Sequence, residues 1–146
     1  MPTLDDTRRL EDAHAYRIHR VSRLLRRQLI GTLDGTPLTP EQFFLLFRLH
    51  EQDGRSQREL ADPDLDDRSN ITRQVAALQR AGLVTRRPDP RDARKQRVFL
   101  TSDGRALFER LQPAIVQTRR ALFGDLPPEA LSGLEQALAH LEATLR

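Results

Sequence analysis

The chain lacks cysteine and tryptophan, and it holds only one tyrosine and six phenylalanines. Without cysteine, the protein has no disulfide, no thiolate metal site and no thiol that senses oxidation. The longest wholly apolar run is Phe43–Phe47, which is far too short to span a bilayer. The N-terminus has no apolar signal core either, so we expect no membrane partner and a location in the cytoplasm.

The net charge of +3 conceals an uneven distribution over the 146 residues, a length that suits one domain. Residues 68–97 contain nine basic side chains and only two acidic ones, so this segment carries +7 and the rest of the chain −4. Such a local excess suits a polyanionic partner, because neutralised phosphates release condensed counterions. Composition alone leaves a second interpretation open, an ordinary solvated face in a chain with 23 arginines and one lysine.

Periodicity in the first half of the chain predicts four helices. An apolar stripe at three- and four-residue steps predicts a long first helix that ends at Gly31 and Gly35. The residues of the stripe are Leu10, His14, Ile18, Val21, Leu25 and Leu29. A second helix starts at Thr39-Pro40-Glu41-Gln42, and its apolar run 43–47 predicts that it is enclosed on most sides.

The third and fourth predicted helices are close together in the sequence. The third has a capping-box start at residues 56–59 and is ended or kinked early by Pro63. The fourth begins after the caps Asp66 and Asp67 and stops at Gly82. Two short helices separated by a few residues are a helix-turn-helix pattern, although this spacing is common.

After Gly82 the period changes to that of strands. Residues 83–87 and 96–100 predict a β-hairpin across a turn rich in proline and aspartate. A fifth helix follows the caps Thr101 and Ser102, with a kink expected at Pro113. A last helix begins after residues 127–129 with a narrow seam of coiled-coil spacing, and its members are Leu131, Leu134, Leu138, Leu141 and Leu145.

The fourth helix has two chemically different faces. Ile71, Val75 and Leu78 fall on one side and predict its buried face. The opposite side, flanked by Asn70 and Thr72, carries Ser69, Arg73, Ala76, Ala77 and Arg80. Alanines allow close approach to a major groove, where arginine can bind guanine, asparagine can read adenine, and hydroxyls can bind phosphates or base edges. The alternative is a surface helix with ordinary polar side chains.

The loop of the hairpin is the second electropositive element. It holds Arg91 and Arg94 beside Asp89 and Asp92. An arginine on a thin loop can enter the minor groove, and a carboxylate two residues away can fix its guanidinium. The alternative is that Asp92 and Arg94 only stabilise a surface turn, as an exposed pair worth about 0–1 kcal/mol.

The sequence resembles the multiple-antibiotic-resistance-regulator (MarR) family over about residues 38–108. The similar segments in the helices are Leu38-Thr39-Pro40-Glu41-Gln42-Phe43, Glu59-Leu60-Ala61, Asp67-Arg68-Ser69 and Ala81-Gly82-Leu83-Val84 with Arg86. The similar residues in the hairpin and the following helix are Asp89-Pro90, Asp92, Arg94, Val98, Leu100-Thr101 and Gly104.

The resemblance implies a mainly α fold of about six helices with a small β-hairpin wing. It implies one MarR-like domain over 1–146, with a winged helix-turn-helix lobe at 37–101 and dimerisation helices at 1–36 and 102–146. It also implies a homodimeric transcriptional repressor in a bacterial or archaeal nucleoid, which binds a pseudo-palindromic DNA operator and responds to a small aromatic or anionic ligand.

The resemblance also implies roles for individual residues. The expected DNA-binding residues are Arg68, Ser69, Asn70, Thr72, Arg73, Arg80, Arg91 and Arg94. Among these, Arg94 would enter the minor groove with Asp92 as its orienting partner. A ligand crevice between the dimerisation helices and the lobe would be lined by Tyr16, Arg17, His19, Arg20, Phe43 and Phe47. The alternative is that these six side chains only pack the helix junction.

Two positions depart from the family pattern. Pro63 and Asp64 stand where the family has an uninterrupted, more apolar third helix, which affects the geometry of the turn. Ala93 replaces the arginine commonly found before Arg94, which removes a charge from the tip of the wing, and Arg91 could compensate.

Other functions are poorly supported by the sequence. Residues 62–66 imitate the start of a calcium loop, but Asp67 and Arg73 stand where glycine and glutamate are required. The four histidines form no zinc-binding pair, and there is no glycine-rich phosphate loop, nucleophile elbow or cysteine nucleophile. We therefore expect no metal, no cofactor and no enzymatic activity. Two alternatives remain, an architectural or non-specific DNA-binding protein and a helical module that binds protein through its leucine seam.

Overall fold

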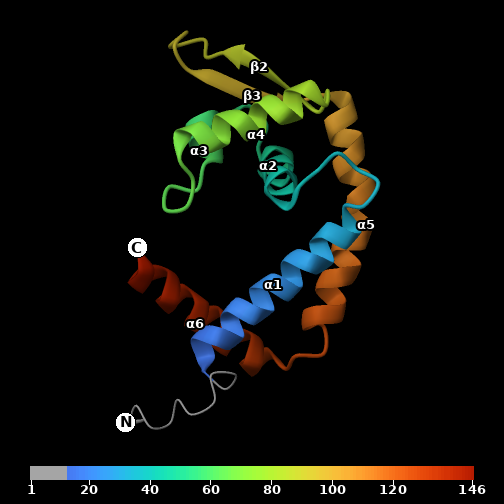
Figure 1. The fold of residues 1–146 in the computed structure, drawn as a ribbon, viewed down its shortest axis with the longest axis vertical. Helices are drawn as coiled ribbons and strands as arrows, with labels where there is room; N and C mark the ends of the chain where they lie inside the picture. Colours follow the sequence, from blue (N-terminus) through green and yellow to red (C-terminus); the bar gives the residue numbers. More distant parts are fainter. Residues whose placement is uncertain (1–12) are drawn as a thin grey trace. The chain divides into compact units, whose positions relative to one another are not determined.

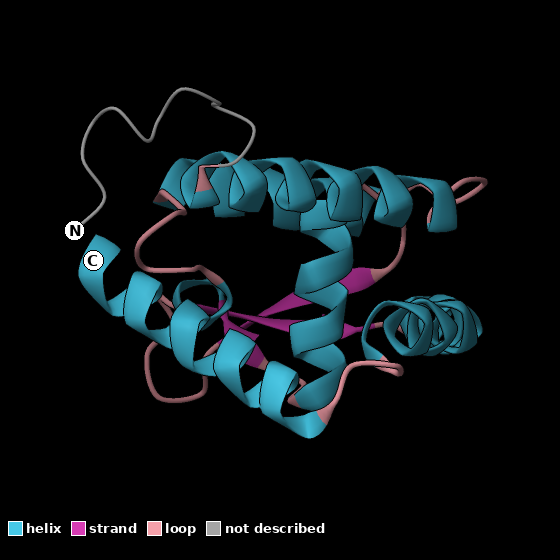
Figure 2. Cartoon of the chain, turned by 90° about the horizontal axis from the view of Figure 1, so that it is seen from below, coloured by secondary structure: helices cyan, strands magenta, loops and turns pink. Residues whose placement is uncertain are grey.

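The computed structural model describes residues 13–146, which fall into two compact units that meet between Pro40 and Glu41. Most of these residues are helical, and one small sheet is present (Figure 2). Leu10 and the rest of residues 1–12, which belong to the predicted first dimerisation segment, lie outside the described residues.

The first unit contains helix α1 (His14–Thr32). None of the residues of α1 is buried, and its exposed apolar side chains are Ile18, Val21, Leu24, Leu25 and Ile30. The helix ends at Thr32, between Gly31 and Gly35, which confirms the predicted end. Gly35, which lies after the helix, has a φ of 76°, a conformation that glycine adopts without strain.

The second unit contains the predicted helix-turn-helix. Its helices are α2 (Pro40–Glu51), α3 (Gln57–Leu60) and α4 (Arg68–Arg80) (Figure 1). The capping box of α3 is confirmed, because the Glu59 amide donates to the Ser56 hydroxyl at 3.2 Å and the Ser56 amide donates to the Glu59 carboxylate at 2.9 Å. Asp67 caps α4 by accepting from the Asn70 amide at 2.6 Å.

The segment between α3 and α4 accommodates Pro63 without distortion of either helix. Helix α3 has only four residues and ends at Leu60, which confirms that it stops before the proline. The backbone carbonyl of Asp62 accepts from the Asp66 amide at 2.9 Å, and the Asp66 carboxylate accepts from the Asp62 amide at 2.8 Å. These reciprocal bonds close the turn, which replaces the longer third helix of the family pattern.

The predicted hairpin is present, and a third strand joins it. Strands β2 (Val84–Pro88) and β3 (Gln96–Leu100) pair antiparallel, with β2 one residue later than predicted. Strand β1 (Arg55–Ser56) pairs with the other edge of β3, which gives the order β1-β3-β2. The prediction of a two-stranded hairpin was therefore incomplete, because a strand of two residues has no alternating pattern to detect.

The core of the second unit lies between α2, α4, the sheet and the start of α5 (Ser102–Phe123). Its buried apolar residues are Phe43, Leu45, Leu46, Leu49, Leu60, Ile71, Val75, Leu78, Leu83, Val84, Val98, Leu100, Leu107, Phe108 and Leu111. The Phe108 ring stacks on the Phe43 ring with centroids 5.8 Å apart and joins α5 to α2. The prediction that residues 43–47 are enclosed on most sides was wrong, because Phe44 is 53% exposed and Phe47 is 40% exposed.

Helix α5 starts directly at the base of the hairpin. The Thr101 hydroxyl caps the helix by accepting from the Gly104 amide at 3.0 Å, and it donates to the Gly82 carbonyl at 2.6 Å. A β-carbon at Gly104 would lie 2.0 Å from the Leu83 carbonyl oxygen, so only glycine allows this approach. The helix continues through Pro113, and the kink expected there stays a prediction.

The last helix is α6 (Pro128–Leu145), and none of its residues is buried in the single chain. Four leucines of its seam, Leu131, Leu134, Leu138 and Leu141, are 36% to 43% exposed. A shallow groove of about 500 Å³ runs along this seam beside Phe123 at the end of α5.

Candidate nucleic-acid interface

Helix α4 buries one face and presents the other to solvent. Ile71, Val75 and Leu78 are at most 4% exposed, which confirms the predicted buried face. The outward face exposes Arg68, Ser69, Arg73 and Arg80, with the half-buried alanines Ala76 and Ala77 between the last two. Within residues 13–146, the three guanidinium groups make no hydrogen bond or ion pair, so they are available to a partner.

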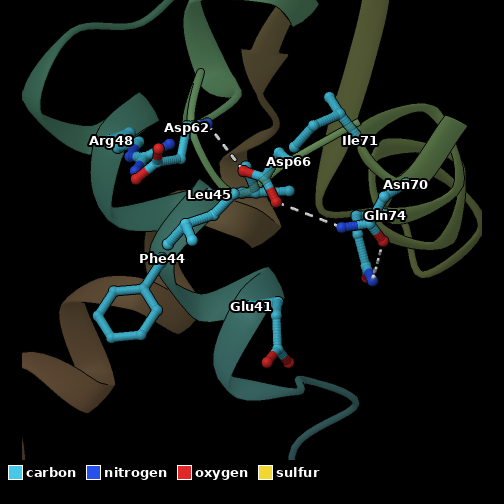
Figure 3. Close-up of a pocket in the computed structure, with 10 residues that line it drawn as sticks. Glu41, Phe44, Leu45, Arg48, Asp62, Asp66, Asn70, Ile71 and Gln74 are labelled. Atoms are coloured by element: carbon cyan, nitrogen blue, oxygen red, sulfur yellow. Dashed lines mark hydrogen bonds between the residues drawn. The ribbon is translucent and has the colours of Figure 1, made fainter. Parts of the chain in front are cut away.

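Two polar residues of α4 that the sequence assigned to DNA are already bonded within the fold. The Asn70 side chain donates to Asp66 at 3.3 Å and accepts from Gln74 at 3.4 Å (Figure 3). The Thr72 hydroxyl donates to the Arg68 carbonyl at 2.8 Å and accepts from Gln57 at 3.3 Å. These bonds use one of the two N–H groups and one of the two acceptor lone pairs of the Asn70 amide, whereas the Thr72 hydroxyl has used its only donor and must exchange that bond before it can donate to a phosphate.

The wing loop carries the predicted pair of Asp92 and Arg94. The Arg94 Nε lies 3.2 Å from the Asp92 Oδ1, which also accepts from the Arg94 amide at 3.1 Å. The Arg94 side chain is 91% exposed, so the carboxylate orients a guanidinium that otherwise extends into solvent. Arg91 is also exposed on the same loop.

A second carboxylate organises the wing loop, and the sequence did not reveal its role. Asp89 accepts from the backbone amides of Arg91 at 2.8 Å and Asp92 at 3.3 Å, and from the Arg97 Nε at 2.7 Å. The Arg91 amide bond, followed by the bond from Arg97, holds the pKa of Asp89 below its ordinary value of 3.8. The contacts of Asp89 are local in sequence, but nothing in the composition of the loop distinguishes it from Asp92.

Two arginines of strand β2 make contacts that stabilise the wing, and the sequence did not assign these contacts to either of them. The Arg86 guanidinium donates to the Thr72 carbonyl of α4 at 3.1 Å, so it links the wing to the helix beside it (Figure 1). The Arg87 guanidinium lies 4.8 Å from the centroid of the Phe99 ring on β3, a cation–π contact.

The residues of the predicted ligand crevice lie in both units. Tyr16 is half-buried on α1, and Arg17, His19 and Arg20 are exposed there. In the second unit, Phe43 and Phe47 contact Phe108, with ring centroids 5.8 and 6.0 Å apart. The two phenylalanines therefore pack against α5, as the alternative interpretation expects, and the crevice itself stays a prediction.

A pocket of about 170 Å³ lies within the second unit between α2, the α3–α4 turn and α4 (Figure 3). Neither Phe43 nor Phe47 lines it, and Phe44 does. Its other lining residues are Glu41, Leu45, Arg48, Asp62, Leu65, Asp66, Asn70, Ile71 and Gln74.

The part of the chain that the structure describes contains no cluster of three or more histidine, aspartate or glutamate side chains that could hold a metal ion. Within residues 13–146, no helix combines the length and the apolar character needed to cross a bilayer.

A short helix, a recognition-type helix with an exposed basic face and an adjoining three-stranded wing define a winged helix-turn-helix protein. Residues 38–95 match the sequence profile of the MarR family.

Comparison with known proteins finds both activating and repressing relatives. The chain is 30% identical over 115 residues to the transcriptional activatory protein BadR of Rhodopseudomonas palustris, a match that covers 76% of this chain and 63% of BadR. It is 36% identical over 89 residues to the transcriptional repressor NicR of Pseudomonas putida, covering 61% of this chain and 56% of NicR. The chain thus spans less than two thirds of either relative.

A solved structure of BpsR from Bordetella bronchiseptica, a protein whose DNA binding is regulated by 6-hydroxynicotinic acid, has a similar fold. The TM-score is 0.80 at 25% identity, and the match covers 92% of this chain and 96% of BpsR. The similarity therefore extends beyond the helix-turn-helix to the flanking helices.

Proposed function

We propose that this protein is a homodimeric transcription regulator that binds specific sequences of double-stranded DNA, and that it acts as a ligand-responsive repressor. The observation that carries the proposal is the outward face of α4, where Arg68, Arg73 and Arg80 are exposed and unpaired around two small alanines. Helices of this shape fit the major groove, and bidentate arginine contacts distinguish guanine from other bases.

The wing supports the same function at a second groove. Arg94 is exposed and held by Asp92, a geometry that suits insertion of one guanidinium into a narrow minor groove. Each lobe would therefore combine major-groove reading by residues 68–80 with a minor-groove contact from the loop that holds Arg91 and Arg94. Asn70 contributes through its second N–H group and second lone pair, and Thr72 donates if its hydroxyl leaves the Arg68 carbonyl.

Dimerisation is supported by the apolar seam of α6, whose leucines from Leu131 to Leu141 remain 36% to 43% exposed within residues 13–146. We assign the dimerisation region to residues 1–36 and 102–146, and the DNA-binding lobe to residues 37–101. Charge supports pairing of α1 with α6 of a second copy, because α1 has five arginines and no acidic residue, and α6 has three glutamates and no lysine or arginine. The two lobes would then contact half-sites about 10–10.5 base pairs apart on a pseudo-palindromic operator.

A small aromatic or anionic ligand would modulate binding, as 6-hydroxynicotinic acid does for BpsR. Its site would be the crevice of Tyr16, Arg17, His19, Arg20, Phe43 and Phe47. The protein would have no enzymatic activity and would work in the cytoplasm, at the nucleoid.

The decisive experiment selects bound duplexes from a random pool and then measures competition by bulk DNA. We expect a symmetric motif and a preference of about 10³ or more for the selected site over bulk DNA. A preference near one would favour an architectural protein that coats DNA without regard to sequence. No association with random duplex at low salt, or association that salt does not weaken, would favour a protein-binding module.

A further inference from the structure

Asp89 is the most heavily bonded side chain of the wing loop. One carboxylate oxygen accepts from the backbone amides of Arg91 and Asp92, and the other accepts from the Arg97 Nε. Its side chain is only 12% exposed, whereas that of Arg94 is 91% exposed. Asp89 therefore faces the loop interior, and Arg94 faces outward.

The bonds of Asp89 extend to the tip of the loop. The Asp89 amide donates to the Lys95 carbonyl at 2.8 Å, and the Lys95 amide donates to the Asp92 carbonyl at 2.9 Å, which closes the loop. The Asp92 carboxylate then holds Arg94 through its amide and its Nε. A continuous path of hydrogen bonds thus runs from Arg97 on β3 through Asp89 and Asp92 to the Arg94 guanidinium.

The change in DNA affinity on removal of Asp89 has one sign if the carboxylate only lies near DNA and the opposite sign if it fixes the loop. A carboxylate beside DNA repels phosphates, so its removal from an ordinary surface position tightens binding. A carboxylate that fixes the loop has the opposite effect, because its loss leaves a flexible arginine that must be ordered on binding.

We propose that Asp89, which accepts a hydrogen bond from Arg97, is a positioning residue that fixes the conformation of the wing loop so that Arg94 reaches DNA. It touches no nucleotide itself and acts through Asp92. The proposal rests on the proposed DNA-binding function.

The test measures the affinity of the full-length dimer for the selected duplex at fixed salt. We expect Asp89→Asn to bind roughly tenfold more weakly than the parent, as the loss of about one ordered contact requires. Arg97→Gln should have a similar effect, and Arg97→Lys should retain part of the affinity. Asp125→Asn, which makes the same change of charge between α5 and α6, should leave affinity unchanged or slightly higher.

The background of Arg94→Ala separates positioning from a general effect on stability. In that background Asp89→Asn should cause no further loss, because the two residues act on one contact. Additive losses would overturn the proposal, and so would an Asp89→Asn variant that binds as tightly as the parent or more tightly; the proposed function would stand in both cases.

If the parent chain binds no duplex, the proposed function falls, and the loop is then examined in the free protein. Amide hydrogen exchange at Arg91 and Asp92 should be at least about tenfold faster in Asp89→Ala than in the parent, because these amides lose their acceptor. Unchanged exchange rates would show that Asp89 does not set the loop.

Discussion

Helices α4 and α6 are both amphipathic, but within residues 13–146 the apolar face of α4 is buried, whereas the apolar face of α6 remains partly exposed. Ile71, Val75 and Leu78 of α4 are at most 4% exposed, while the leucines of the α6 seam from Leu131 to Leu141 remain 36% to 43% exposed. An apolar seam of this length is unfavourable in water and marks an interaction site. The contrast assigns a different task to each helix. The apolar face of α4 packs in the core of the lobe and its polar face is left for a partner, whereas the apolar face of α6 is left for a partner.

The largest effect should follow from placing charged side chains in the leucine seam of α6. Leu134→Glu with Leu138→Glu should produce a monomer, because two carboxylates would be buried without partners. Affinity for a duplex with two half-sites should then fall by about 10²–10⁴, since the lobes no longer bind together. Light scattering with size exclusion and a DNA titration measure both changes.

A control variant places the same two charges on the opposite face of α6. Gln136→Glu with Ala143→Glu should remain dimeric. A seam variant that elutes and binds DNA as the parent does would show that α6 is not the interface.

Substitutions on the apolar face of α4 should lower the stability of the fold rather than disrupt the dimer. Leu78→Ala should lower the free energy of unfolding by about 2–5 kcal/mol, because it leaves a cavity at a fully packed position. Chemical denaturation at a fixed protein concentration measures the change. Gln79→Ala, at an exposed neighbouring position, should stay within about 0.5 kcal/mol of the parent. Equal stabilities of the two variants would contradict the packing of α4.

The outward face of α4 should affect DNA binding and not folding. Arg73→Ala should cost about 1–3 kcal/mol of binding free energy at one base position and relax specificity there. Repeated duplex selection with the variant identifies that position. Arg110→Ala, an exposed arginine on α5, is the control and should retain the parental preference; a parental motif in Arg73→Ala would remove this residue from the interface.

The smallest effect should come from the acidic residues beside the α6 seam. Glu142→Gln should weaken the dimer by no more than about 1 kcal/mol, because an exposed ion pair with a basic α1 is worth little. The loss should disappear in high salt, where such pairs are screened. Sedimentation at two salt concentrations measures it, and a Glu142→Gln dimer that is tighter than the parental dimer at low salt would argue against pairing of α1 with α6.

Helices whose boundaries depend on local chemistry were predictable from the sequence. Ser56 and Asp67 cap α3 and α4 as expected, and the buried face of α4 follows from its period. Strand β1 could not be predicted, because two residues carry no pattern and Arg55 is fixed by pairing with the distant Val98. The exposure of Phe44 and Phe47 was also missed, since periodicity cannot tell how many sides of α2 are covered.

The candidate site was predictable as a set of residue types but not as a set of contacts. The pair of Asp92 and Arg94 is two residues apart, so its geometry follows from the loop. Asp66 and Asn70 are four residues apart, yet their side chains bond only because the α3–α4 turn brings Asp66 within range of Asn70. Arg97 reaches Asp89 across the hairpin, which requires the strand register that only the fold defines.

The contact of Gly104 with the Leu83 carbonyl has a mechanical consequence. Because no side chain separates the first turn of α5 from the strand that leads into the wing, α5 cannot rotate or slide there without carrying the root of the wing along. A shift of the first turn of α5 is therefore expected to move Leu83 and the start of β2 with it.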